Sequence, residues 1–153
     1  MKNIGRILDQ VIIHDLSSET KEDVLSEMCS LVKQNTHVTD SRALLHAIKA
    51  RETIMSTGIG MGIAIPHAKI ASVTDIVMVV GTSGAGIDYE ALDDMPVHKI
   101  ILIAASNTQG DEFLSVLGKI GAFLNEPDKR EQFLQEQAPD KIKELLQSIG
   151  DQK

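Results

Sequence analysis

Residues 97–105 read VHKIILIAA, a stretch in which apolar side chains are nearly continuous. A strand with one face in solvent alternates apolar and polar residues, whereas a strand covered on both faces reads as an unbroken apolar run. The stretch therefore predicts a central strand with cover on both sides of its sheet. We expect an α/β fold, built as a three-layer helix–sheet–helix sandwich.

Shorter apolar runs on the N-terminal side of this stretch predict the other strands. Residues 11–13 (VII) and 76–80 (IVMVV) each suit a strand. Gly81, Gly84 and Gly86 follow the second run and predict a turn there. Residues 87–89 would then form a short edge strand.

Helical periodicity fills the intervening segments and the C-terminal third. Apolar residues recur at intervals of three and four in each of these segments. Ser17 or Ser18 is the expected N-cap of the first helix, and Thr39 or Asp40 that of the second. The predicted helices span residues 19–34, 41–51, 110–125, 127–135 and 139–149.

Length and composition favour one domain over residues 1–153, with a core of aliphatic side chains. Hydrophobic residues make up 42% of the 153 residues, and aromatic residues only 3%. The net charge of −7 disfavours binding to nucleic acid or to an anionic membrane surface. Few aromatic side chains also argue against a base-stacking platform.

Cysteine usage and hydropathy predict a cytoplasmic protein that is not inserted in a membrane. Cys29 is the only cysteine, so no intramolecular disulfide or cysteine-based zinc site can form. The first residues lack the apolar run of a signal peptide, and no stretch approaches the roughly 20 apolar residues that span a bilayer.

Residues 51–69, RETIMSTGIGMGIAIPHAK, carry the chemistry of the chain. They predict a glycine-rich loop that runs into a short strand over residues 63–65, which Pro66 ends. His67 follows and should project from the sheet edge into a cleft. A neutral imidazole is a competent nucleophile toward phosphorus, so His67 is the candidate catalytic residue.

The same segment offers groups that suit a phosphoryl group. Glycine amides can approach an anion without a Cβ in the way, hydroxyl groups donate hydrogen bonds, and an arginine offers a planar fork. Positioning and such donors would suffice for transfer, so we expect no metal or other cofactor. The candidate phosphate-binding residues are Arg51, Ser56, Thr57, Gly58, Gly60 and Gly62.

From spacing alone, a second interpretation of this segment stays open. The glycines match G-x-G-x-G and lack the Gly-Lys-Ser/Thr ending of a Walker A loop. Turns and edge strands also use such a pattern. A plain loop with a solvent-facing histidine is therefore the alternative that residue types alone allow.

Residues 56–67, STGIGMGIAIPH, resemble the phosphorylation-site signature of enzyme IIA domains of the bacterial phosphotransferase system, fructose–mannitol type, which include the nitrogen-regulatory IIA proteins. The resemblance implies a mixed sheet between helical layers. It implies that His67 accepts phosphate from the carrier HPr or a nitrogen-branch relative, and that Arg51 is the active-site arginine. The phosphoryl group would pass to a sugar-specific IIB domain or serve as a regulatory signal.

One departure from this family concerns a second active-site histidine, which many members carry at the start of the helix after the last strand. Phe113, or else Glu112, falls at that position here, and no histidine follows His98. The alternative function is therefore a regulatory module that docks on a transporter or kinase, with phosphotransfer weakened or lost. The sequence decides neither this choice nor the oligomeric state.

Overall fold

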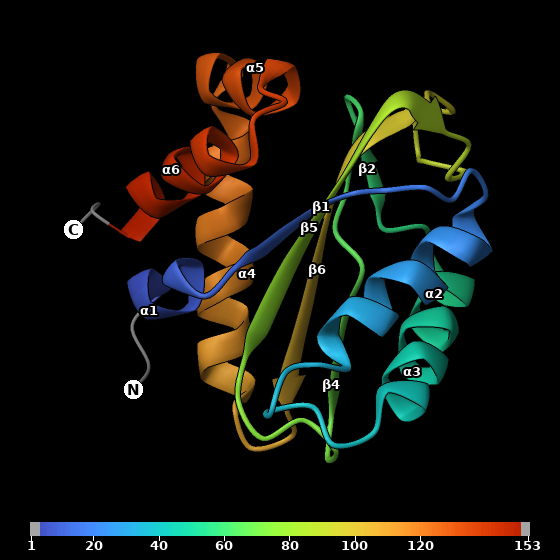
Figure 1. Ribbon diagram of the computed structural model, residues 1–153, viewed down its shortest axis with the longest axis vertical. Coiled ribbons are helices and arrows are strands. Elements are labelled where there is room, and N and C mark those ends of the chain that lie inside the picture. Colours follow the sequence, from blue (N-terminus) through green and yellow to red (C-terminus); the bar gives the residue numbers. More distant parts are fainter. Residues whose placement is uncertain (1–3, 151–153) are drawn as a thin grey trace.

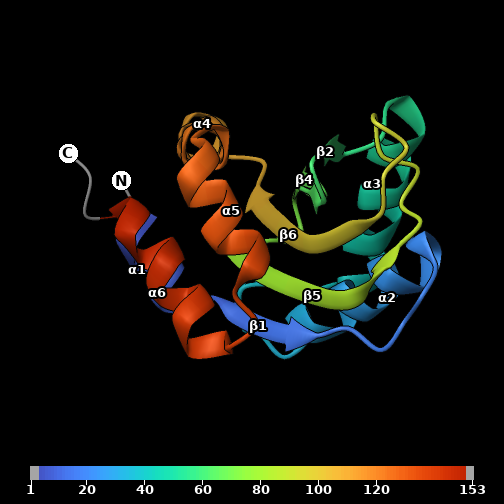
Figure 2. The same cartoon turned by 90° about the horizontal axis from the view of Figure 1, so that it is seen from above.

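A mixed sheet of six strands lies between two layers of helices in the computed structural model, which describes residues 4–150 (Figures 1 and 2). Helices α2 and α3 cover one face of the sheet, and α1, α4, α5 and α6 lie on the other side. This arrangement confirms the predicted α/β sandwich and the mixed sheet.

The strands follow the order β1-β5-β6-β3-β2, and β4 also pairs with β6. Strand β6 is antiparallel to β5 and parallel to both β3 and β4, while β1 is parallel to β5 and β2 is antiparallel to β3. The bounds are β1 Ile12–Asp15, β2 Gly58–Gly60, β3 Ile63–Ala64, β4 His67–Ile70, β5 Val77–Ile87 and β6 Val97–Ser106.

The helices lie close to the segments that periodicity predicts. Asp40 caps α3, with its carboxylate accepting from the backbone of Arg42 and Ala43. Helix α1 is not among the helices that the sequence predicts. Among the described residues, no helix has the length and apolarity needed to cross a bilayer. The bounds are α1 Ile4–Asp9, α2 Lys21–Val32, α3 Ser41–Ile54, α4 Gly110–Asn125, α5 Pro127–Gln135 and α6 Pro139–Gly150.

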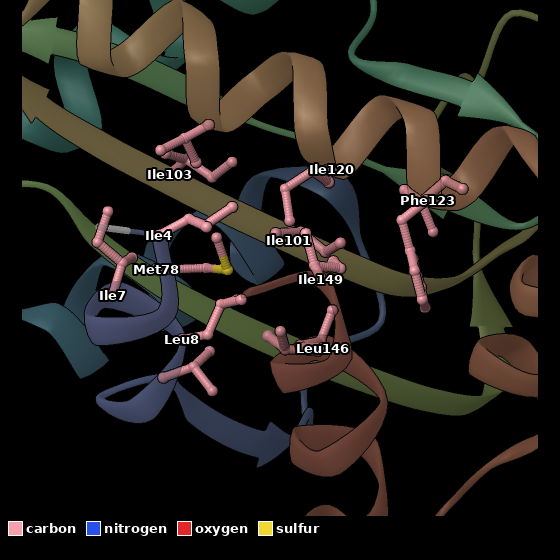
Figure 3. Packing of buried hydrophobic residues seen from close by; sticks show 14 of the residues in the cluster. Ile4, Ile7, Leu8, Met78, Ile101, Ile103, Ile120, Phe123, Leu146 and Ile149 are labelled. Atoms are coloured by element: carbon pink, nitrogen blue, oxygen red, sulfur yellow. The ribbon is translucent and has the colours of Figure 1, made fainter. Parts of the chain in front are cut away.

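Strand β6 is apolar from Ile100 to Ala105 because its alternate side chains belong to two separate cores. Ile101 and Ile103 pack with α1, α4 and α6 on one face, whereas Ile100 and Leu102 pack with α2 and α3 on the other. Figure 3 shows the first core, where side chains from three helices meet those of the sheet. Its labelled residues are Ile4, Ile7, Leu8, Met78, Ile101, Ile103, Ile120, Phe123, Leu146 and Ile149.

The predicted turn after residue 80 is wrong, because β5 continues through the glycines to Ile87. Glycine also occurs in a strand where another element approaches closely. A Cβ on Gly81 would lie 2.6 Å from the Met28 sulfur of α2 and 2.9 Å from Leu16. The glycine here thus permits close packing of a helix and does not end the strand.

The expected N-cap of the first long helix is also wrong, because Thr20 caps α2 by accepting from the Asp23 amide at 3.2 Å. The amides of Ser17 and Ser18 instead donate to the Glu27 carboxylate, at 3.1 Å and 2.9 Å. That carboxylate comes from the second turn of the same helix, so tertiary contacts of this loop override the local capping pattern.

Candidate functional site

His67 opens β4, where it pairs with Ile103 of β6, and its side chain is half-buried. It thus follows the end of β3, as the sequence predicts, but it is also the first residue of a new strand, because the interruption at Pro66 separates β3 from β4. The ring Nδ1 lies 2.8 Å from the backbone oxygen of Ile65. A carbonyl oxygen can only accept, so the proton of the neutral ring resides on Nδ1 and Nε2 keeps its lone pair.

Phe113 lies beside the His67 ring, near the start of α4. The two ring centroids are 5.8 Å apart, and the planes are tilted by 55°. Helix α4 follows β6 after a short connection, and β4 runs parallel to β6, so the first turn of this helix lies near β4, where Phe113 contacts the His67 ring. The position that the sequence assigns to a second histidine thus does adjoin His67, and it holds an apolar ring without a hydrogen-bond donor.

Arg51 lies in the last turn of α3, which packs against β4. Its Nη1 donates to the backbone oxygen of Met55 at 2.8 Å, and the rest of its guanidinium keeps free donors. The Ile65 amide donates to the Thr57 oxygen at 2.9 Å, which ties the segment after α3 to the segment before His67. The arginine is therefore anchored on the chain that runs alongside the histidine.

The two predicted hydroxyl donors have different surroundings. Ser56 is half-buried and its Oγ accepts from the Gly58 amide at 3.1 Å, which leaves its own proton available. Thr57 is only 3% exposed, and its hydroxyl donates to Glu52 and lies 3.0 Å from the Tyr89 hydroxyl. The structure thus turns the Thr57 hydroxyl into the interior.

Glu52 is the centre of a buried polar network that sequence reasoning missed. Its side chain is 6% exposed and pairs with the Lys21 ammonium at 2.8 Å, while Tyr89 donates to it at 3.0 Å. The Thr57 amide also donates to Glu52, at 3.1 Å. Burial alone would raise the pKa of this carboxyl, but Lys21 and Thr57 outweigh burial and lower it.

No sequence signal pairs Lys21 with Glu52, since they lie on different helices. The Lys21 ammonium also sits 4.6 Å from the centre of the Tyr89 ring, in cation–π contact. The network fixes the turn between α3 and β2, directly beside Arg51. It therefore orders the chain segment on which the arginine rests.

The three glycines lie in a hairpin that leads away from His67. Gly58 pairs with Ala64 in β2 and β3, while Gly60 and Gly62 have φ values of +98° and +84° around the turn. The Gly62 oxygen accepts from the amides of His98 and Lys99, four residues along β6 from the partner of His67. At strand spacing this is about 13 Å, so the structure does not bring Gly62 to the imidazole.

These features define a class of protein: an α/β domain that presents a half-exposed histidine at the start of a strand, with its Nδ1 facing a backbone oxygen, and an anchored arginine on the helix that packs against this strand. The family model described as the phosphoenolpyruvate-dependent sugar phosphotransferase system, EIIA 2, matches residues 7–149. The chain belongs to this family, which confirms the resemblance of its histidine signature.

Curated relatives include both sugar-specific and regulatory proteins. The chain is 37% identical over 146 residues to a fructose-specific EIIABC component of Bacillus subtilis, covering 95% of this chain but 23% of that protein. It is 31% identical over 130 residues to a fructose-specific EIIA component of Haloferax volcanii, covering 85% and 84%. A nitrogen regulatory protein of Pseudomonas aeruginosa is 31% identical over 112 residues, covering 73% of each chain.

Solved structures share the fold. The nitrogen regulatory protein IIA-Ntr from Neisseria meningitidis superimposes with a TM-score of 0.83 at 24% identity, covering 94% of this chain and 98% of that one. Enzyme IIA of the mannitol system of Escherichia coli, in a complex with phosphorylated enzyme IIB, gives a TM-score of 0.74 at 21% identity, covering 89% and 94%.

Proposed function

We propose that the chain is a phosphoryl-relay component that carries a phosphate on Nε2 of His67. The observation that carries this proposal is the 2.8 Å contact between His67 Nδ1 and the Ile65 oxygen. This contact holds the proton on Nδ1, so the lone pair of Nε2 is free to attack phosphorus. The half-exposed ring also leaves room for a donor protein.

The transfer moves one phosphoryl group between two imidazoles. Nε2 of His67 attacks the phosphorus of a phosphohistidine on an HPr-like carrier, so a new N–P bond forms as the old one breaks. The carrier's imidazole leaves with the bonding electron pair. The proton of His67 stays on Nδ1 throughout, in a hydrogen bond to the Ile65 oxygen, and the proposed step needs no metal or cofactor.

Arg51 and Ser56 are the proposed donors to the phosphoryl oxygens. The guanidinium fork of Arg51 has free N–H groups beyond its bond to Met55, and the Ser56 hydroxyl has an unused proton. Such donors stabilise charge on the equatorial oxygens during transfer. For Thr57, Gly58, Gly60 and Gly62 the proposed role is indirect: they build the turn and the hairpin that place these donors.

The proposed partners are an HPr-like carrier on the donor side and a IIB domain or a regulated transporter or kinase on the acceptor side. The mannitol enzyme IIA of the same fold is named as forming a complex with phosphorylated enzyme IIB. Relatives named as nitrogen regulatory proteins favour a signalling use of the same phosphate. We place the relay in the cytoplasm, where the buried thiol of Cys29, whose pKa burial raises to about 12, would stay inert.

Mass spectrometry after incubation with phosphorylated HPr tests the proposal. The wild-type chain should gain about 80 Da, the mass of one phosphoryl group, in an acid-labile form. His67→Ala should gain nothing, and the matched control His46→Ala, which removes an exposed histidine of α3, should behave as wild type. Labelling of His67→Ala, or no labelling of the wild type, contradicts the relay.

Docking without phosphotransfer is the second candidate function, and the apolar neighbour of His67 favours it. Phe113 offers the imidazole no donor, and the exposed side chains of Met55 and Leu114 lie on segments that flank it. A pull-down with IIB, transporter or kinase partners separates the two functions. Capture that is identical for the wild type and His67→Ala, together with no phosphorylation, would favour docking alone.

A further inference from the structure

A cavity lies at the opposite end of β6 from the partner of His67. It is a cavity of about 780 Å³ between the ends of β5 and β6 and the segment that joins α5 to α6. Neither His67 nor Arg51 nor Phe113 lines it, and Lys99 at its wall is about 13 Å along the strand from the level of His67. Its size falls within the range of small-molecule sites.

Lys99 is the unusual residue of this cavity. It is only 4% exposed, and its neighbours on the same face of β6, Ile101 and Ile103, belong to the apolar core. Among the described residues the ammonium makes one hydrogen bond, to the Leu134 oxygen at 3.2 Å, and two of its protons are not used there. Within residues 4–150 no carboxylate lies at ion-pair distance from it.

Burial destabilises the charged form of Lys99, and nearby carboxylates offset this destabilisation only in part. Burial lowers the pKa of the ammonium, while the more distant carboxylates of Glu136 and Asp15 act in the opposite direction. A buried cation without a contacting anion is stabilised when an anion binds beside it. The Lys99 ammonium thus provides a position in the cavity where a negatively charged group would bind.

Strand β6 is irregular where it meets the cavity. The Gly62 oxygen accepts from two successive amides, those of His98 at 2.8 Å and of Lys99 at 3.1 Å. In the pairing of β5 with β6 the register shifts between Thr82 and Ile87, an irregularity of a kind that redirects side chains and is frequent beside binding sites. His98 also lines the cavity, and its Nδ1 lies 2.9 Å from the Ser83 oxygen.

The remaining wall has both polar side chains, which include Ser83, Thr82, Gln135 and Gln137, and an apolar surface. The Ser83 hydroxyl accepts from the Gly86 amide at 3.1 Å and keeps its proton. Met61, Met95 and Leu134 line the cavity with apolar side chains. A ligand here would meet a cation and a hydroxyl at one place and an apolar wall at another.

We propose that this cavity binds a small organic anion, with its carboxylate or phosphate head at Lys99 and a short body against the apolar wall. Asp15 also lines the cavity, and its negative charge disfavours ligands with several negative charges. The site is independent of the chemistry at His67, because no residue of the proposed relay contributes to it.

A purely structural role for Lys99 makes a different prediction. Leu134 lies in the last turn of α5, where a cation stabilises the unpaired carbonyl groups of a helix end. If capping were its only role, the protein would not respond to anions at this site. Ligand binding, measured directly, therefore separates the two roles where a stability measurement would not.

An NMR titration of the ¹⁵N-labelled protein provides the test, with sodium lactate, glycerol 3-phosphate and inorganic phosphate as probes and sodium chloride at equal ionic strength as the blank. Lactate reports a carboxylate head and glycerol 3-phosphate a phosphate head. We expect saturable shifts of the Gly62, Ser83 and Gly84 amides with at least one organic probe. Absence of saturable shifts with all probes, or shifts confined to other surfaces, overturns the proposal.

Variants then tie the binding to the cavity. Lys99→Met should weaken binding at least about tenfold, the loss expected for one charge-assisted hydrogen bond, whereas Lys119→Met, at an exposed position of α4, should not. Gly84→Phe leaves Lys99 in place and adds a side chain where a Cβ meets open space, so it should block binding in a folded protein. Unchanged binding in both cavity variants overturns the proposal.

Discussion

Glu52 is the buried anion that holds the turn between α3 and the β2–β3 hairpin, and its replacement by alanine tests that role. The carboxylate accepts from the Thr57 amide at 3.1 Å and from the Tyr89 hydroxyl at 3.0 Å, and it pairs with Lys21 at 2.8 Å. Alanine would leave a largely buried ammonium and a buried phenol without their acceptor. Loss of one member of a buried pair costs about 3–5 kcal/mol, so we expect Glu52→Ala to lower the free energy of unfolding by that amount.

A second substitution separates charge from shape. Glu52→Gln keeps the volume and one acceptor oxygen but removes the charge, and it should cost about 1.5–3 kcal/mol. Urea unfolding at pH 7 measures both values, with Glu144→Ala, at an exposed position of α6, as a control that should stay within about 0.5 kcal/mol of wild type. A cost below about 1 kcal/mol for Glu52→Ala would refute the view that this network stabilises the turn.

The pH dependence of the same variants provides an independent check. The pKa of Glu52 is lowered from its ordinary value of 4.5, because Lys21 and Thr57 outweigh the opposing effect of burial. The stability that its ionised form contributes is therefore complete above pH 4.5 and is lost as the pH falls through the lower folded-state pKa. The difference in free energy of unfolding between wild type and Glu52→Gln should narrow below pH 4.5. A difference that stays constant with pH would contradict the charge assigned to Glu52.

Three further variants probe the site and its support. Arg51→Lys removes the planar fork and should slow phosphoryl transfer from HPr about ten- to hundredfold in a rapid-quench assay, with thermal stability unchanged; an unaltered rate would exclude the arginine from the reaction. Phe113→His places an N–H donor beside the reacting imidazole and should accelerate the same transfer, whereas a slower rate would show that the apolar ring is needed there. Gly58→Ala places a Cβ 2.7 Å from that of Ala91 and should cost about 1–3 kcal/mol in urea unfolding, in contrast to Gly118→Ala, whose Cβ meets open space.

Local sequence patterns predicted those helices and strands whose pattern of buried and exposed side chains lies within a single segment. The continuous apolar run of residues 97–105 predicts cover on both faces, and β6 does separate two cores. The helices were predicted for the same reason, since each buries one stripe of its surface. The signature of residues 56–67 carried the family assignment, because it is a local sequence feature.

Contacts between distant segments decided what these patterns could not. The glycines from Gly81 to Gly86 suggest a turn, but the closeness of α2 and pairing with β6 keep them in a strand. The even spacing of Gly58, Gly60 and Gly62 suggests an anion cradle at His67, yet hairpin pairing carries Gly62 toward the far end of β6.

The sequence by itself determined the layered α/β architecture, the helices other than α1 and the resemblance to the family, because periodicity and a contiguous motif are properties of neighbouring residues. Tertiary structure alone decided the contact of the His67 ring with Phe113 and the burial of Glu52 and Lys99. Each of these depends on register and packing between elements, and free energies of such long-range contacts leave no periodic trace in the chain.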